Sequence, residues 1–312
     1  MFYGNFCNCI EIAVIYNELI IVYKPKERVD YMQDIRIYAF ADEASSKVDE
    51  QIVAMKRNGL NGLEVRGVDG QNISIITTDK AKELKKKLDD AGLVTWSMGS
   101  PIGKIKMGDD FAAHLEKFKH TLELANILEA GNLRLFSFFM PADVPAENFK
   151  NEVIDRMGQF VEIAKDTGIA LCHENEKGIY GDTAERCLEI HKSLPTIHGI
   201  FDPANFVQCD VDTLKAWELL KPYVRYMHIK DALTDGMVVP AGQGAGNVAK
   251  IVKEYIAAGG RDFTIEPHLK VFKGFAELEA AGDKTVIPAY NYPDANTAFD
   301  TACDAFKAIV QG

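Results

Sequence analysis

Several features that would point to common protein classes are missing from this sequence of 312 residues. It has no cysteine pair at CxxC spacing and no regular cysteine framework. The cysteines are scattered, at Cys7, Cys9, Cys172, Cys187, Cys209 and Cys303. This pattern fits reduced thiols in a cytoplasm better than a secreted disulfide scaffold, so we predict a cytoplasmic protein.

The chain also lacks an excess of positive charge. Its 46 acidic and 35 basic residues give a net charge of −11. A surface of that sign repels polyanions, so the sequence predicts neither a nucleic acid nor an anionic membrane as a partner. The apolar fraction of 47% is ordinary for a globular protein. The sequence leaves open whether the protein forms a homo-oligomer.

No apolar run is long enough to span a bilayer. The candidate near the N-terminus, "CIEIAVIYNELIIVYKPKER", is interrupted by Glu11, Asn17 and Glu18, and its basic residues follow the apolar part. It therefore fails as a signal peptide or a membrane span. Two interpretations stay open for residues 1–31, a small hairpin or a poorly ordered extension, and we predict one domain over residues 32–312.

From Ile35 onward, short β-type runs alternate with amphipathic helical runs. The strand candidates are "IRIYAF", "GLEVRG", "LVTWSM", "NLRLFSF", "GIALCHE", "IHGIFD", "VRYMHIK" and "DFTIEP". Between them lie helical patterns such as "TDKAKELKKKLDDAG", with N-caps in "TTDK" and "GDTAE" and glycine stops at Gly59, Gly92 and Gly168. Eight such units, with no GxGxxG after the first strand, predict an α/β fold of the (β/α)8 TIM-barrel type with a short N-terminal extension.

Four consecutive predicted strands end in groups that can ligate a metal. They are Glu174, Asp202, His228 and Glu266, spaced by 28, 26 and 38 residues, each close to one β/α unit. A (β/α)8 barrel gathers its strand ends at one mouth, where three carboxylates would repel each other without a cation between them. The alternative for each acidic residue alone is a helix cap. Together they predict one divalent metal ion, with Mn²⁺, Mg²⁺ or Co²⁺ favoured and Zn²⁺ an option.

The motifs "HENEKGIYGDT", "FDPANF", "HIKDA" and "EPHL", in this order, resemble the sugar isomerase/epimerase superfamily with the xylose-isomerase-like TIM barrel. The resemblance covers the chain from Ile35 to the C-terminus. It implies that Glu174, Asp202, His228 and Glu266 are metal ligands, and that Glu174 and Glu266 are also the catalytic acid/base pair. Some epimerases of the family carry histidine where this chain has Asn205, so the substrate does not transfer from them.

Other residues at predicted strand ends are candidates for binding the substrate. They are Lys230, Asn205, His268, Glu64, Arg66, Trp96 and Phe40. Five of them have a plainer alternative: a solvated loop lysine for Lys230, an internal ion pair for Glu64 and Arg66, and rim packing for the two aromatic residues. The glycine-rich "VVPAGQGAGN" is a weak candidate for a loop that cradles a phosphate group.

The chemistry expected of this site is removal of a proton from a carbon next to a carbonyl, with the metal stabilising the enediolate. We therefore predict a metal-dependent isomerase or epimerase of a small carbohydrate, a ketose or related polyol. Two alternatives remain open: a metal-dependent dehydratase or lyase of a keto-inositol or oxidised sugar, and a catalytically silent sugar-binding barrel. A DNA-repair endonuclease is disfavoured because the seven histidines are scattered and the charge is negative.

Overall fold

The computed structural model describes residues 10–15, 18–23, 34–271 and 292–312. Two compact units result, residues 1–34 and residues 35–312. In the first, β1 (Ile10–Ile15) pairs antiparallel with β2 (Glu18–Tyr23), as one of the two interpretations of this segment expects. The domain boundary after residue 31 stays a prediction.

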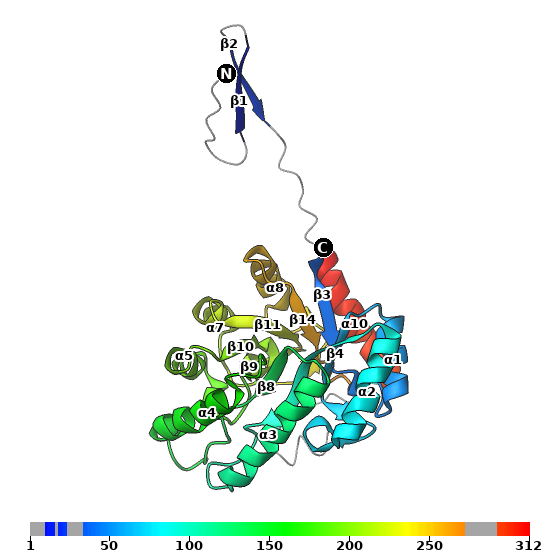
Figure 1. Cartoon of the computed structure of the whole chain (residues 1–312). Helices are drawn as coiled ribbons and strands as arrows, with labels where there is room; N and C mark the ends of the chain where they lie inside the picture. Colours follow the sequence, from blue (N-terminus) through cyan, green and yellow to red (C-terminus); the bar gives the residue numbers. More distant parts are fainter. Residues whose placement is uncertain (1–9, 16–17, 24–33, 272–291) are drawn as a thin grey trace. The chain divides into compact units, whose positions relative to one another are not determined.

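The second unit is a closed barrel of eight parallel strands, which confirms the predicted (β/α)8 fold (Figure 1). The strand order around the barrel is β10-β11-β14-β3-β4-β7-β8-β9. The strands are β3 (Arg36–Ala39), β4 (Gly62–Val65), β7 (Val94–Ile102), β8 (Asn132–Leu135), β9 (Ala170–Glu174), β10 (His198–Phe201), β11 (Val224–Ile229) and β14 (Asp262–Ile265). Each lies within or overlaps one predicted run, and β7 extends four residues beyond "LVTWSM".

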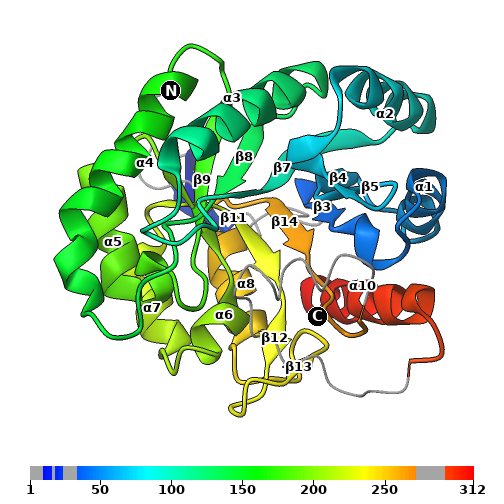
Figure 2. The ribbon, with the colours of Figure 1, turned by 90° about the horizontal axis from the view of Figure 1, so that it is seen from below.

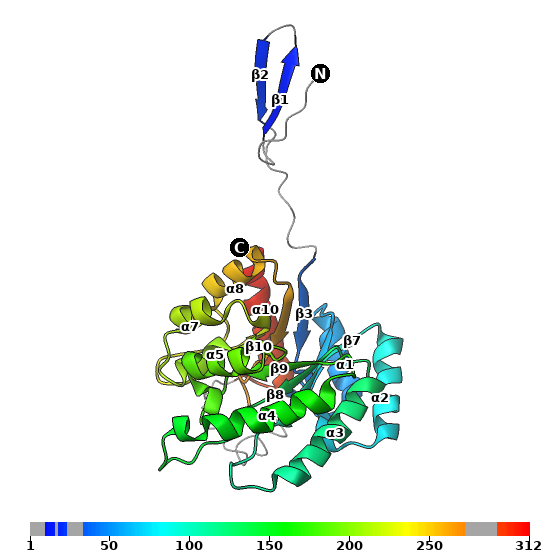
Figure 3. The same cartoon turned by 60° about the vertical axis from the view of Figure 1, so that its left-hand side comes forward.

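Helices form a ring outside the strands, as Figure 2 shows. The described helices are α1 (Val48–Arg57), α2 (Thr78–Ala91), α3 (Phe111–Ile127), α4 (Lys150–Ala164), α5 (Ala184–Ser193), α6 (Pro203–Val207), α7 (Thr213–Leu220), α8 (Val248–Ala257) and α10 (Ala295–Gln311). In Figure 3, α3 and α4 lie side by side on the outside of the barrel. No helix in the described ranges is both long and apolar enough to cross a membrane. Residues 272–291, between β14 and α10, lie outside the described residues.

Helix α2 illustrates how local sequence sets these elements. The Thr77 hydroxyl accepts a hydrogen bond from the Lys80 amide (3.2 Å), and Gly92 ends the helix in the left-handed conformation at φ 71°. Leu84 and Leu88 are buried, each contributing roughly 1.5–3 kcal/mol. The same cap recurs at α5, where Thr183 accepts from the Arg186 amide, so both predicted N-caps are confirmed.

Short antiparallel ribbons decorate the barrel where strands continue into loops. One joins β5 (Gly67–Val68) to β6 (Gln71–Asn72), and the other joins β12 (Asp231–Ala232) to β13 (Val238–Val239). The second ribbon directly follows β11, so it extends the strand that carries His228. Because βα loops follow the carboxyl ends of the strands, these ribbons belong to the end of the barrel where function is expected.

Candidate metal centre

The four predicted ligand residues converge at the carboxyl end of the barrel. Glu174 is the last residue of β9, His228 lies near the end of β11, and Asp202 and Glu266 directly follow β10 and β14. These strands are neighbours in the barrel. One ligand atom from each residue lies within 4.8 Å of all the others, and all four residues are buried. Three carboxylate oxygens and one imidazole nitrogen form a donor set that suits a divalent cation.

Asp202 fits such a site while also capping a helix. Its Oδ1 accepts a hydrogen bond from the Asn205 amide (3.0 Å) at the start of α6. Its buried Oδ2 accepts no hydrogen bond of acceptable geometry from the described residues, and Lys230 Nζ lies 3.0 Å away. The predicted capping alternative is therefore true of one oxygen, while the other faces the cluster.

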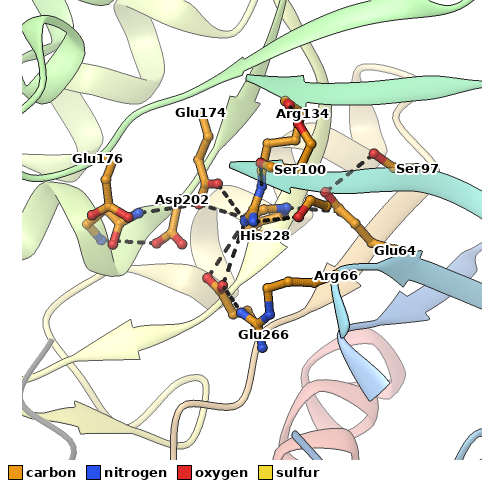
Figure 4. Close-up of polar contacts among 12 residues, drawn as sticks. Glu64, Arg66, Ser97, Ser100, Arg134, Glu174, Glu176, Asp202, His228 and Glu266 are labelled. Carbon is orange, nitrogen blue, oxygen red and sulfur yellow. Dashed lines mark hydrogen bonds and ion pairs between the residues drawn. The ribbon is translucent and has the colours of Figure 1, made fainter. Parts of the chain in front are cut away.

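The His228 ring lies between two carboxylates (Figure 4). Its Nε2 is 3.1 Å from Glu64 Oε2, and its Nδ1 is 2.9 Å from Glu174 Oε1. Burial lowers the His228 pKa, but Glu174 and Glu64 outweigh burial and raise the pKa to about 10. Nδ1 is thus the ring nitrogen that faces the cluster, and Glu64 is placed to fix the ring orientation through Nε2.

Glu64, which the sequence offers as a residue that contacts substrate hydroxyls, binds protein groups with both oxygens in this structure. Glu64 is fully buried, and both of its oxygens are engaged by Ser97, Tyr226 and His228. Burial raises the Glu64 pKa, but His228 and Arg134 outweigh it and hold the pKa below its ordinary value. Glu64 therefore positions the His228 ring, and its contact with substrate hydroxyls remains a prediction.

Each of the two predicted acid/base glutamates has one oxygen bound to an arginine (Figure 4). Arg134 Nη1 donates to Glu174 Oε2 (2.9 Å), and Arg66 Nη1 donates to Glu266 Oε1 (3.1 Å). Both guanidinium groups lie over the Phe40 ring, at 4.4 Å for Arg66 and 4.8 Å for Arg134. The remaining oxygen of each glutamate faces His228 or Lys230.

Arg66 also pairs with two carboxylates besides that of Glu266. Its guanidinium donates to Asp42 (2.9 Å) and Glu43 (2.9 Å), so Arg66 forms buried ion pairs with both residues, and its contact with substrate hydroxyls remains a prediction. Glu43, Glu266 and His268 also offer closely spaced ligand atoms. Because Arg66 already supplies positive charge to both glutamates, we assign no second ion there.

Lys230 is buried inside the cluster and is not a solvated loop residue. Its Nζ lies 2.6 Å from Glu266 Oε2 and 3.0 Å from Asp202 Oδ2. Burial alone would raise the pKa of Glu266, yet Lys230, His268, His228 and Arg66 together outweigh burial and keep that pKa well below its ordinary value. Burial dominates at Asp202 and raises its pKa. Lys230 therefore lies within reach of any oxygen that enters between these two carboxylates.

Asn205 and His268 are also brought to the site. Asn205 Nδ2 donates to the Asn175 carbonyl (2.9 Å) and lies 3.4 Å from Glu174 Oε1. The His268 amide donates to Glu43 Oε2 (2.6 Å), and its ring Nε2 is 3.9 Å from Glu266 Oε1. His268 has a φ of 44°, a strained backbone of the kind that gathers at functional sites. Their contacts with a substrate remain predictions.

Of the two aromatic candidates, Phe40 contacts the cluster and Trp96 does not. Phe40 contacts the cluster, with its ring edge-on to His228 at 5.2 Å, but it is fully buried beneath the arginines. Trp96 is not brought to the site: it stacks on Tyr38 at 4.7 Å and lies under Arg36, the first residue of β3. The physical reason is that β7 ends at Ile102, so Trp96 lies near the amino end of its strand.

The amides of the glycine-rich loop after β11 bind a carboxylate of the protein itself, that of Asp231. Asp231 Oδ2 accepts hydrogen bonds from the amides of Gly242 (2.9 Å) and Gly244 (3.0 Å). Its Oδ1 accepts from Gly246 and Ala232, both at 2.9 Å. These amides are therefore committed to an internal carboxylate, which argues against a phosphate cradle and anchors the loop beside Lys230.

Several residues of this site escaped the sequence analysis. Arg134 was missed, although a single arginine inside the apolar run "NLRLFSF" is a signal, since buried charges need partners. Glu176 was missed too; it is buried and binds Lys104 Nζ (3.0 Å) at the edge of the cluster. Asp42 and Glu43 lie in a short 3-10 helix (Ala41–Glu43) for which the sequence had no periodic signal.

Comparisons with known proteins support the barrel fold and identify the family. The family model described as "Xylose isomerase-like TIM barrel" matches residues 52–271. No protein in a search of curated proteins matches the chain. Among solved structures, similarity extends to an L-ribulose 3-epimerase, with 19% identity, a TM-score of 0.68, and coverage of 89% of this chain and 94% of that one.

Two further structures share the fold. The probable 3-DHS dehydratase AsbF from Bacillus anthracis has 16% identity and a TM-score of 0.66, covering 88% of this chain and 99% of its own. IOLI protein, described with a binding zinc atom, has 15% identity and a TM-score of 0.67, covering 89% and 98%. At these identities the structural likeness speaks for the fold alone. The family model spans most of the barrel, and the chain belongs to the xylose isomerase-like TIM barrel family.

Proposed function

We propose that this protein is a divalent-metal-dependent sugar isomerase or epimerase that acts on a ketose or a related polyol. The observation that carries the proposal is the buried cluster of Glu174, Asp202, His228 and Glu266, whose ligand atoms lie within 4.8 Å of one another. Epimerases among the structural neighbours support it. We propose these four residues as the ligands, with Nδ1 as the donor atom of His228.

The bound ion, for which Mn²⁺, Mg²⁺ or Co²⁺ is favoured and Zn²⁺ is an option, would polarise the substrate oxygens and stabilise negative charge on an enediolate. Proton transfer is the work of the protein. Glu174 and Glu266 are each held through one oxygen by an arginine, and the other oxygen faces His228 in Glu174 and Lys230 in Glu266. We propose that one removes a proton from the carbon beside the carbonyl and the other returns a proton.

Lys230 is proposed to bind a substrate oxygen on which charge develops, because its ammonium lies among the cluster carboxylates. Asn205 and His268 border the same space and are proposed to contact substrate hydroxyls. Return of the proton to the opposite face of the same carbon gives epimerisation, and return to the neighbouring carbon gives isomerisation. The same residues serve both outcomes.

A second candidate is a dehydratase or lyase of a keto-inositol or oxidised sugar, favoured by the dehydratase among the structural neighbours. It needs the same proton abstraction, followed by loss of a hydroxyl group from the adjacent carbon. A catalytically silent sugar-binding barrel would use the site without any proton transfer.

These candidates separate in one experiment. The protein is incubated with Mn²⁺ and a panel of ketoses, keto acids and inosose-type compounds in D₂O, and products are followed by NMR. An isomerase or epimerase incorporates deuterium at carbon without losing water, whereas a dehydratase gives an unsaturated product. Absence of deuterium incorporation and of turnover across the whole panel would contradict the enzymatic proposal.

A further inference from the structure

The amino end of the barrel holds a cavity of about 560 Å³, away from the candidate metal centre. Its walls come from the first residues of three neighbouring strands, Arg36 of β3, Arg225 of β11 and Asp262 of β14. The residues that follow α7 and α8, including Lys221, complete it. This volume is in the range of small-molecule pockets.

The cavity is basic, although the chain as a whole is acidic. Four cationic residues line it, Arg36, Lys221, Arg225 and Arg261, against one carboxylate, Asp262. Four positive charges minus one negative charge leave a local charge of +3, in a chain whose net charge is −11. A concave surface lined by one sign of charge concentrates ions of the opposite sign.

Two of these arginines keep donors for a ligand. Arg225 donates through Nε to Asn132 Oδ1, and its terminal nitrogens form no hydrogen bond with any residue the structure describes. Arg36 binds Asp262 through Nη2 (2.6 Å), and its side chain is about half exposed. Guanidinium groups with open donors bind oxyanions and carboxylates through paired hydrogen bonds.

A plainer explanation covers part of this charge. Arg261 Nη1 donates to the carbonyls of Ile256 (2.8 Å) and Gly260 (2.6 Å), so it caps the carboxyl end of α8. Lys221 follows α7 and pairs with Glu218 on the surface. Helix capping does not explain Arg225, which lies at the start of a strand and is only partly exposed.

We propose that this cavity binds a small dianion, such as a phosphate ester or a dicarboxylate, with Arg225 and Arg36 as its principal ligands. Asp262, which accepts a hydrogen bond from the Tyr38 hydroxyl (3.2 Å), positions Arg36 through their ion pair. The site lies at the other end of the barrel from the metal centre, so it does not depend on the proposed activity.

The test uses the full chain loaded with Mg²⁺, titrated calorimetrically at constant ionic strength with inorganic phosphate in one arm and succinate in the other. We expect saturable binding at one site in at least one arm, and the preferred arm identifies the chemical class. Arg225→Gln is expected to raise the Kd about tenfold or more. Arg36→Gln serves as a second variant, because its exposed side chain is safer for folding.

Lys86→Gln on the exposed face of α2 is the matched control, since it removes one positive charge far from the cavity lining. Its Kd should stay within twofold of the parent value. Absence of saturable binding in both arms would overturn the proposal. So would an unchanged Kd in both arginine variants, because the anion would then bind elsewhere.

Discussion

The two ends of the barrel use charge in opposite ways. At the carboxyl end, Glu174, Asp202, His228 and Glu266 are at most 3% exposed and are tied to partners at 2.6–3.4 Å. At the amino end, cations surround an open cavity, and Arg36 is about half exposed. Buried charges with close partners hold a fixed geometry, whereas exposed charges mainly attract counter-ions. This difference is why we propose proton-transfer chemistry at the first end and anion binding at the second.

Among these variants, Glu266→Gln should cause the largest loss of activity at the carboxyl-end site. The amide keeps the shape of the side chain but cannot accept a proton, so deuterium exchange at the substrate carbon should fall by about 10²- to 10⁴-fold. NMR in D₂O measures the exchange, and circular dichroism checks the fold. The exposed Glu218→Gln on α7 is the control. Exchange at the parental rate in Glu266→Gln would rule out its proton-transfer role.

Arg134→Met should lower the activity of the carboxyl-end site because Arg134 positions the Glu174 carboxylate. Without the 2.9 Å bond to Oε2, the Glu174 carboxylate is free to rotate, and kcat should drop by about 10- to 100-fold. Arg134→Lys should recover part of the loss. A structural role alone would lower the thermal stability of Arg134→Met while leaving kcat near the parental value. The exposed Arg57→Met, which loses a surface pair with Asp300, is the control.

Metal affinity should depend on pH through His228. Its pKa is raised to about 10 by the flanking carboxylates, and a protonated ring cannot bind a cation through Nδ1. Each ion bound below that pH must therefore displace one proton, so affinity should rise about tenfold per pH unit between pH 6 and 9. Calorimetry in buffers of different ionisation enthalpy would count the released proton. An affinity that is flat over this range would contradict Nδ1 as a ligand.

Gly244→Ala tests the loop beside the cluster, with a smaller effect expected. A Cβ there would lie 2.3 Å from Asp231 Oδ1 and 2.5 Å from the Ala232 carbonyl. The loop must shift, which should lower the free energy of unfolding by about 1–3 kcal/mol. Gly108→Ala, where a Cβ meets nothing within 4 Å, is the matched control. Equal stability of both variants in urea would show that the loop is not tightly anchored.

The sequence predicted the eight strands and the convergence of the four ligand candidates because both depend on periodicity and on parallel strands sharing one mouth. The sequence did not predict residue roles that depend on contacts between distant parts of the chain. The extension of β7 to Ile102 removed Trp96 from the site. The first loop amide that binds Asp231, that of Gly242, is 11 residues later in the chain, so nothing local distinguished an internal carboxylate from a phosphate. The Arg134–Glu174 pair spans 40 residues and becomes visible only in the folded barrel.

The central claim, that the carboxyl-end cluster holds one divalent ion, is tested most directly by titrating metal-stripped protein with Mn²⁺ and following the EPR signal of the free ion. We predict one ion per chain in the parent protein and in the control Asp212→Asn, whose exposed carboxylate caps α7 and lies 3.4 Å from Lys215 Nζ. Asp202→Asn should weaken binding by roughly 100-fold or more. Equal binding by Asp202→Asn and the parent, or no stoichiometric binding by the parent, would contradict the account.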